Sequence, residues 1–92
     1  MNDAITEPRD VRLRRLTMRS MRRGIKEMDV ILIRFSKARL DSLSALDLDL
    51  YDALLEENDQ DLYQWVSGQV APPVRFSPLI DEIARVACGQ NP

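Results

Sequence analysis

The sequence predicts an all-α protein, a compact bundle of five short helices. Apolar residues recur every three or four positions along almost the whole chain, and no stretch makes a convincing strand. The few glycines and prolines stand at positions where helices start or end. With 92 residues, the chain has the length of one domain and can bury one modest core.

The first two expected helices are separated by a glycine. The first runs from about Pro8, which suits a first helical position, to Arg22. The second follows Gly24 and runs to about Leu40. Their buried faces have the spacing of amphipathic helices. These faces comprise Leu13, Leu16, Thr17, Ser20 and Met21 in the first helix, and Ile25, Met28, Ile31, Leu32 and Phe35 in the second.

The third expected helix has the clearest start. Ser44 is a good N-cap, and Leu43 and Leu48 take the two positions of a hydrophobic staple around it. The helix is expected to reach about Glu57. Its core face is expected to comprise Leu46, Leu50, Ala53 and Leu54.

The fourth expected helix follows a turn at residues 58–61. It carries Leu62, Trp65 and Val66, and it ends at Gly68, a natural left-handed position after a helix. We expect Trp65 to pack into the core, because it follows Leu62 by three residues. Residues 70–76, which include two adjacent prolines, are expected to be extended.

The fifth expected helix begins with Ser77 as its cap and Pro78 at its first position, and it ends at Gly89. Its buried residues are expected to be Leu79, Ile80, Ile83, Ala84 and Ala87. The five helices together predict one domain over residues 8–89, with flexible ends at residues 1–7 and 90–92.

The composition excludes several classes of active site. The chain has no histidine, which rules out Ser–His–Asp and Cys–His catalysis and histidine metal sites. The single cysteine, Cys88, cannot form an internal disulfide or a cysteine-based zinc site, and no base is expected beside it. The acidic residues at 59–61 lack the full pattern of a calcium loop. We therefore expect no catalytic residue and no metal.

The ends of the chain and its hydropathy bear on localisation. No apolar run reaches the roughly 18 residues that span a membrane. Residues 1–10 carry three acidic side chains and no apolar segment, so they resemble neither a signal peptide nor a transit sequence. The sequence therefore predicts a protein of a reducing cytoplasm that does not insert into membranes.

The charge is divided unevenly along the chain. The first 40 residues carry 11 Lys and Arg against 5 acids, whereas the rest carry 2 against 10. Four arginines form a stripe along the first helix: Arg12, Arg15, Arg19 and Arg22. Such a stripe binds phosphates, so a small helical nucleic-acid-binding or regulatory protein is one interpretation, although few aromatic residues are available for stacking. In the other interpretation, the stripe pairs with the acidic third helix inside the fold. The sequence leaves both interpretations open.

The segment from Arg23 to Glu27 is the best candidate for a docking surface. A surface glycine at position 24 lets a partner's backbone approach closely, and the charged residues beside it offer directional contacts. Alternatively, Gly24 only separates two helices, and Arg23 and Glu27 form an exposed pair worth a few tenths of a kcal/mol. Weaker candidates for the same surface are Arg19, Arg22 and Asp29.

Residues 22–29, Arg-Arg-Gly-Ile-Lys-Glu-Met-Asp, resemble the RGxxE motif of the SdhE family. These proteins are FAD assembly factors of succinate dehydrogenase, called succinate dehydrogenase assembly factor 2 in eukaryotes. The similarity covers about residues 12–68 and includes Phe35 and the acidic run that leads to Trp65. From Gln69 onward the chain is less similar, and no functional residue is carried over from there.

The resemblance implies a chaperone-like five-helix protein rather than an enzyme. Family members bind the flavoprotein subunit of succinate dehydrogenase, and often that of fumarate reductase, and promote covalent attachment of FAD to a histidine there. By this similarity Arg23, Gly24 and Glu27 contact the partner, and no cofactor is stably bound to the chain itself. Since the chain has no histidine, it cannot be the acceptor. We expect a monomer in the cytoplasm of a bacterium, because no transit sequence is recognised.

Overall fold

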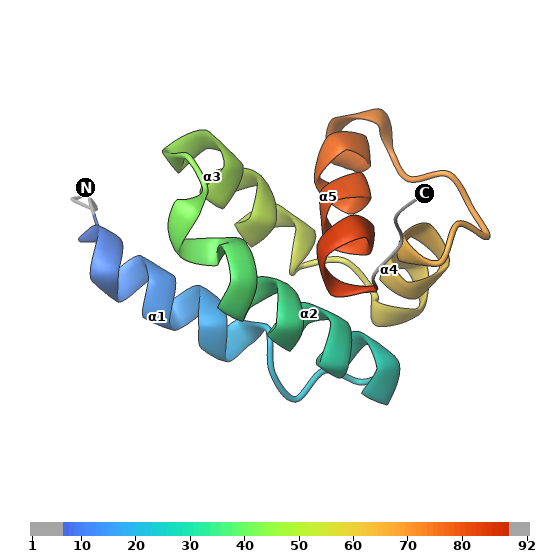
Figure 1. The fold of residues 1–92 in the computed structure, drawn as a ribbon, viewed down its shortest axis with the longest axis horizontal. Helices are drawn as coiled ribbons and strands as arrows, with labels where there is room; N and C mark the ends of the chain where they lie inside the picture. Colours follow the sequence, from blue (N-terminus) through green and yellow to red (C-terminus); the bar gives the residue numbers. More distant parts are fainter. Residues whose placement is uncertain (1–6, 89–92) are drawn as a thin grey trace.

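The computed structural model describes residues 7–88, and within them the chain is helical with short connections (Figure 1). The helices are α1 (Arg9–Arg19), α2 (Lys26–Arg39), α3 (Ala45–Leu54), α4 (Asp59–Val66) and α5 (Ser77–Ala87). Two 3-10 turns, η1 (Leu40–Ser42) and η2 (Val74–Phe76), precede α3 and α5. The predicted all-α bundle of five short helices is confirmed. Apart from Glu7, the ends that we expect to be flexible lie outside the described residues, as does Gly89.

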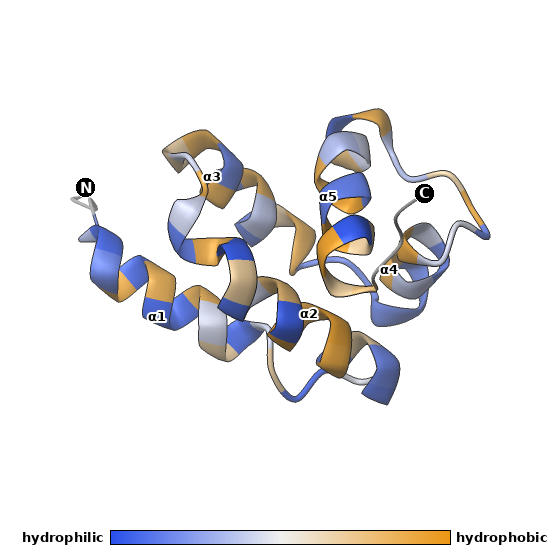
Figure 2. Ribbon diagram, in the orientation of Figure 1, coloured by the Kyte–Doolittle hydropathy of each residue, from blue (hydrophilic) through white to orange (hydrophobic). Residues whose placement is uncertain are grey.

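The core lies around α2, which crosses the middle of the molecule and packs against α1, α4 and α5 (Figure 1). Polar and apolar residues alternate around each helix, as amphipathic helices require (Figure 2). The fully buried side chains include Leu16 of α1, Met28, Leu32 and Phe35 of α2, Tyr51 of α3, Leu62 of α4 and Ile83 of α5. Every helix therefore contributes to one apolar cluster.

Tyr51 places a polar group inside this cluster. Its ring lies 5.7 Å from that of Phe35, centroid to centroid. Its hydroxyl is 2.6 Å from the buried hydroxyl of Ser20, which in turn donates to the carbonyl of Leu16 at 2.8 Å. Burial raises the pKa of Tyr51 to about 12, because the phenolate has no access to water there. This hydrogen bond joins the end of α1 to α3.

Several predicted helix ends are confirmed. The Ser44 hydroxyl accepts the backbone N–H of Asp47 at 3.1 Å, and both residues of the staple are buried. The Asn58 side chain caps α4 in the same way, accepting the N–H of Gln60 at 2.8 Å. Gly68 follows α4 with a φ of 83°, in the left-handed region that glycine favours.

The core face of α3 differs from the prediction at Leu46, whose side chain is 77% exposed. The buried residues of α3 are Leu48, Tyr51 and Leu54. Leu46 precedes Leu48 by two residues, which is about 200° around an α-helix, so it lies on the opposite side. The helix also ends at Leu54 rather than near Glu57.

Other boundaries differ as well. α1 ends at Arg19 instead of Arg22, whose left-handed φ of 57° is incompatible with a right-handed helix. Met21, expected to be buried, is exposed as a result. The segment 70–76 is not extended throughout, since η2 occupies its last three residues.

The start of α5 and the place of Trp65 complete the comparison. Ser77 is the first residue of α5 rather than its cap, which is Phe76. Trp65 is partly buried against the core, with its ring centroid 6.1 Å from that of Phe76. Across the described residues, no helix has the length and apolar character needed to cross a bilayer.

Candidate docking surface between the first two helices

The RGxxE motif occupies the turn between α1 and α2. Ser20 ends α1, and the chain reverses over residues 21–25, where Arg22 has a left-handed φ of 57°. Glu27 lies in the first turn of α2. The exposed residues of this region are Met21, Arg22, Gly24, Lys26 and Glu27. The turn thus presents both charges and a glycine to solvent.

Arg23 points into the molecule instead. Its side chain is 13% exposed and faces Asp59, the first residue of α4, which is 15% exposed. The Arg23 Nε donates to Asp59 Oδ1 at 2.8 Å, and Nη2 lies 2.7 Å from the same oxygen. The alternative of an exposed pair between Arg23 and Glu27 is therefore wrong, since Arg23 precedes α2 and pairs across the bundle.

The rest of the Arg23 guanidinium is also satisfied by this contact. Nη1 donates to the carbonyls of Leu55 at 3.1 Å and Arg19 at 3.3 Å, and Nη2 to that of Glu57 at 3.4 Å. These carbonyls belong to the end of α1 and to the connection between α3 and α4. Arg23 therefore fixes the turn to a segment more than thirty positions later in the chain.

A side chain at position 24 would crowd Asp59, whereas the backbone conformation of Gly24 is not one that only glycine adopts. Its N–H donates to Asp59 Oδ2, while the left-handed residue of the turn is Arg22. A Cβ atom at position 24 would lie 3.1 Å from Asp59 Oδ2, which is tighter than an ordinary contact. Gly24 does lie between two helices, but it is not the residue at which the first one ends, because α1 has already ended at Arg19.

The six predicted docking residues thus fall into three groups. Arg22, Gly24 and Glu27 are exposed on the turn. Arg23 and Asp29 lie behind it, and the Asp29 carboxylate accepts the backbone N–H of Arg23 at 3.3 Å. Arg19 belongs to another set of contacts on α1, described below. Asp59 was not among the predicted residues, although it stands in the acidic run that carries the family resemblance.

Three arginines of α1 pair with two acids of α3 and with one acid just after it, and we call this set the arginine ladder: Arg12 with Asp49, Arg15 with Asp52, and Arg19 with Glu56. Each partner stands 37 positions later, so the two helices run in the same direction. Arg15 Nη2 lies 3.0 Å from Asp52 Oδ2, and Arg19 Nη1 lies 2.6 Å from Asp52 Oδ1.

The ladder decides between the two interpretations of the arginine stripe. Arg15 also pairs with Glu7, since its Nε lies 2.9 Å from Glu7 Oε2. Hydrogen bonds from Arg15 hold the pKa values of both Asp52 and Glu7 below their ordinary range. Three of the four arginines of the stripe are thus paired inside the fold, which argues against the stripe as a nucleic-acid-binding surface. Arg22, its fourth member, takes no part and forms no ion pair within residues 7–88.

The described residues offer little for metal or thiol chemistry. Among residues 7–88, no three acidic or cysteine side chains gather as metal ligands. Cys88 is a free, exposed thiol at the end of α5, and partial burial raises its pKa above the ordinary value.

Comparison with known proteins identifies relatives over most of this fold. The sequence profile of a family described as "flavinator of succinate dehydrogenase" matches residues 14–87. Succinate dehydrogenase assembly factor 2, mitochondrial, from Meyerozyma guilliermondii is 49% identical over 61 residues, which are 66% of this chain and 45% of that protein. Its namesake from Schizosaccharomyces pombe is 36% identical over 87 residues, 92% of this chain and 63% of that protein.

The names of these relatives correct the predicted localisation. They are mitochondrial proteins of fungi, which contradicts the prediction of a bacterial cytoplasmic protein. That prediction depended on not recognising a transit sequence in residues 1–10, and the start of one chain is a weak basis for a compartment.

The matched region coincides with the folded region. This chain spans 45% and 63% of the length of the two relatives above. The family profile begins in the middle of α1 and reaches the last residue of α5, and it includes the turn with the RGxxE motif, the ladder pairs of Arg15 and Arg19, and Asp59. The chain therefore belongs to the family of succinate dehydrogenase flavinators.

Proposed function

We propose that this chain is an assembly factor that binds the flavoprotein subunit of succinate dehydrogenase and promotes covalent attachment of FAD to it. The observation that carries the proposal is the family match, which extends over residues 14–87 and so over the whole support of the motif turn. The flavoprotein subunit of fumarate reductase is a second proposed client, because members of the SdhE family often bind it as well. The chain acts as a monomer.

The chain contributes binding and positioning, and it is not an enzyme. It has no histidine to accept the flavin, so the covalent bond forms on the partner. No FAD remains bound to the chain, and the chemistry of attachment belongs to the flavin and the subunit. Docking favours the conformation of the subunit in which its acceptor histidine lies at reacting distance from the flavin.

The motif divides this work between exposed and buried residues. Gly24 permits close approach of the partner's backbone, since a side chain there would hold the two surfaces apart. Glu27 and the exposed Arg22 beside it offer charge-assisted hydrogen bonds. Arg23, with its guanidinium turned toward Asp59, contributes by holding the turn in place. Arg19 and Asp29 support the turn from α1 and α2.

Co-expression with the flavoprotein subunit tests the proposal directly. In cells that lack their own assembly factor, co-expression of the wild-type chain should give a flavoprotein subunit that fluoresces on a denaturing gel, because its flavin is covalently attached. Gly24→Arg should reduce this fluorescence by about tenfold or more, the loss expected when a central contact of an interface is blocked. Equal bands with the wild type, the variant and an empty vector would refute the assembly role.

Two further variants separate docking from folding. Gly24→Ala places the same Cβ against Asp59 without a bulky side chain, so it measures the cost of crowding alone. Ala38→Arg adds an arginine on an exposed position of α2, well away from the turn. The proposal expects Ala38→Arg to give the flavin fluorescence of the wild type. It expects Gly24→Ala to give a fluorescence between those of the wild type and Gly24→Arg. Unfolding of Gly24→Arg would instead indicate that the glycine is needed for folding, and it would count against its role in docking.

A further inference from the structure

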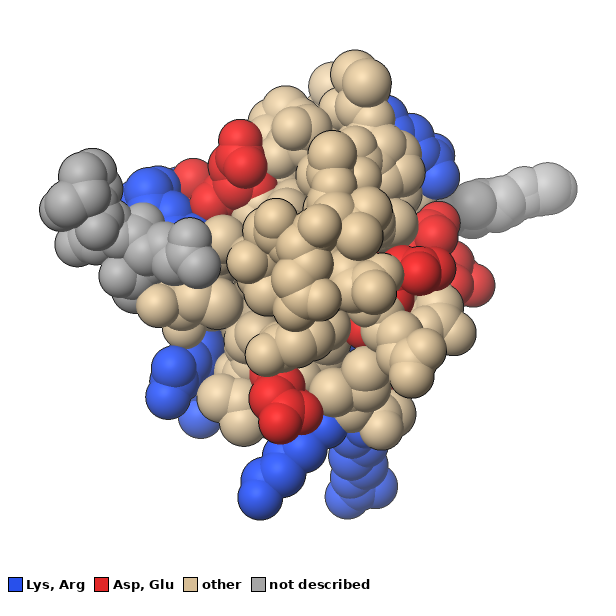
Figure 3. Space-filling model, turned by 90° about the vertical axis from the view of Figure 1, so that its right-hand side faces the viewer, with Lys and Arg blue, Asp and Glu red and all other residues tan. Residues whose placement is uncertain are grey.

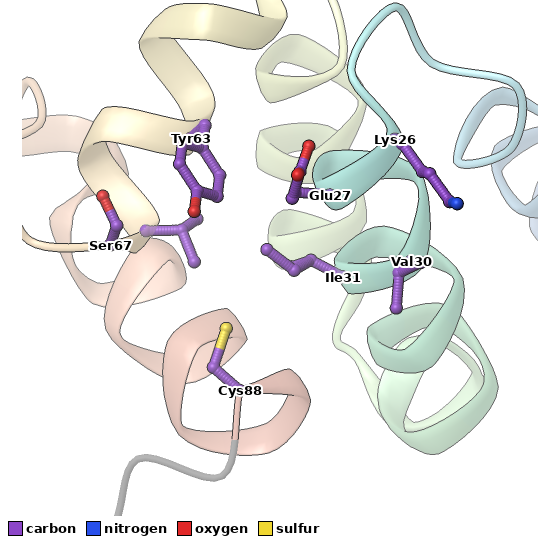
Figure 4. Close-up of a pocket in the computed structure, with 8 residues that line it drawn as sticks. Lys26, Glu27, Val30, Ile31, Tyr63, Ser67 and Cys88 are labelled. Atoms are coloured by element: carbon purple, nitrogen blue, oxygen red, sulfur yellow. The ribbon is translucent and has the colours of Figure 1, made fainter.

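A groove opens beside the motif, between the start of α2, α4 and the end of α5 (Figure 4). Its volume is about 540 Å³, which leaves room for side chains of a partner. Its lining residues are Lys26, Glu27, Val30, Ile31, Tyr63, Val66, Ser67 and Cys88. Glu27 therefore belongs both to the motif and to the groove.

Side chains from three helices converge on this groove. Figure 4 shows Ile31 of α2, the Tyr63 hydroxyl of α4 and the Cys88 sulfur at the end of α5 all directed into the space between the helices. Val66 adds a further apolar wall. The Lys26 side chain points away from the opening, so the charge that faces it is the carboxylate of Glu27. The groove thus has apolar walls and a single acidic edge.

The surroundings suit contact with another protein. The end of the molecule that carries α4 presents a broad uncharged surface with charged side chains at its margin (Figure 3). Such a surface is typical of the centre of an interface. Tyr63 also lines a second hollow, together with the amide side chains of Gln60, Gln64 and Gln69. Amides can bond to the backbone of an extended segment, which has no internal hydrogen bonds of its own.

We propose that the groove receives an extended segment of the client flavoprotein, in which an apolar side chain enters between Ile31 and Val66 and a neighbouring basic side chain pairs with Glu27. The charge argument is direct, because Glu27 forms no ion pair within residues 7–88 and faces the opening. The proposal rests on the assembly function proposed above and extends its docking surface from the turn to α4 and α5. The glutamate of the motif then acts at the edge of a pocket rather than on a flat surface.

The thiol of Cys88 allows a test with the unmodified chain. It is the only cysteine in the sequence and it lines the groove. The full chain is treated with N-ethylmaleimide at about pH 8.5, which supplies thiolate despite a raised pKa. The reaction is followed by mass spectrometry of the peptide that contains Cys88, with and without the flavoprotein subunit. Complex formation is measured in parallel by co-elution in gel filtration.

The expected result is a reaction of Cys88 that is slower by about tenfold or more in the complex, because an occupied groove excludes the reagent. If the complex forms but Cys88 reacts at the rate of the free chain, the groove proposal is overturned and the assembly function is untouched. If no complex forms with the wild type, the assembly function itself fails. If rising concentration of this chain alone protects Cys88, a second copy fills the groove and the proposal is also overturned.

A matched pair of substitutions tests the groove by filling it. Ser67→Trp places an indole in the opening from an exposed position, while Ser42→Trp places one on an exposed position of η1. We expect Ser67→Trp to weaken binding of the subunit by about thirtyfold or more and Ser42→Trp to leave it within about twofold. Both variants should keep the melting temperature of the wild type. Equal binding by the two variants would rule out the groove as a docking site.

Discussion

Two sets of arginine–carboxylate pairs join the basic half of the chain to the acidic half, and they differ in their access to water. In the arginine ladder, Asp49 and Glu56 are 65% and 72% exposed. In the pair of Arg23 with Asp59, both side chains are largely shielded. Exposed pairs contribute little because water and salt screen them, whereas a shielded pair cannot lose one member without leaving a charge unsatisfied. The comparison indicates that the ladder aligns α1 with α3, while Arg23 and Asp59 hold the motif turn.

The largest effect is expected for Asp59→Ala. It removes the acceptor of both the Arg23 side chain and the Gly24 N–H, and it leaves a shielded guanidinium without a carboxylate. The free energy of unfolding should fall by about 3 kcal/mol, measured by urea denaturation.

Asp61→Ala is the matched control for this variant. Asp61 also lies in the first turn of α4 but is exposed, so its loss affects only the helix dipole, by about 0.5 kcal/mol. Equal losses of stability for the two variants would mean that the contact of Asp59 with Arg23 adds nothing to the effect of a charge at the start of α4.

Tyr51→Phe is expected to have the next largest effect, about 1 kcal/mol, because the Ser20 hydroxyl loses a buried partner. Tyr51 also predicts a response to alkali. Its folded pKa is raised from 10.0 to about 12, so the stability it contributes is present below pH 10.0 and is lost as the pH rises toward 12. The free energy of unfolding, measured by denaturation at a series of pH values, should therefore fall less steeply between about pH 10 and 12 in Tyr51→Phe than in the wild type.

Asp52→Asn probes the middle of the ladder, where one carboxylate meets Arg15 and Arg19. We expect a loss below about 1 kcal/mol at neutral pH, because the group is partly exposed. The folded pKa of Asp52 is lowered from 3.8, so its contribution is present above that pH and is lost as the pH falls through the lower folded value. The thermal stabilities of the wild type and the variant should therefore converge in acid. A constant difference down to pH values well below 3.8 would contradict this account.

The smallest effect is expected for Arg12→Gln, at the first pair of the ladder. Its partner Asp49 is the more exposed of the two side chains, so the change should cost about 0.3 kcal/mol at low salt and nothing measurable at high salt. Melting curves at two ionic strengths check this. A loss as large as that of Asp59→Ala would show that α1 depends on its ion pairs for attachment.

The helices could be predicted from the sequence because their determinants are local. The apolar spacing of α2 and the Ser44 cap lie within a few residues of one another, and both are confirmed. The error at Leu46 arose because four leucines in the same short helix fit more than one buried face, and only the packing of Tyr51 selects among them. The early end of α1 was not visible in the local pattern either, because Arg22 fits the spacing of the arginine stripe but has a left-handed φ of 57°.

The support of the candidate site could not be predicted in this way. The motif itself is visible as a local pattern, but the partner of Arg23 stands 36 positions away. Nothing near Arg23 distinguishes an arginine that faces solvent from one that faces the bundle. For the arginine stripe, the sequence left two interpretations open. The acids of the ladder have the same spacing as its arginines, but this matters only once α1 and α3 are known to run in the same direction.

The inward orientation of Arg23 has a consequence for the amount of protein in a cell. Unfolded chains are removed by proteases, so a loss of one or two kcal/mol is enough to change abundance several-fold. Substitutions at Arg23 or Asp59 should therefore deplete the protein, whereas those at Glu27 should leave its level normal and its partner unserved. Substitutions at Arg23 and at Glu27, two positions of one short motif, would then give the same defect in flavin attachment for different reasons. Overproduction of the variant would restore flavin attachment for a substitution at Arg23 but not for one at Glu27.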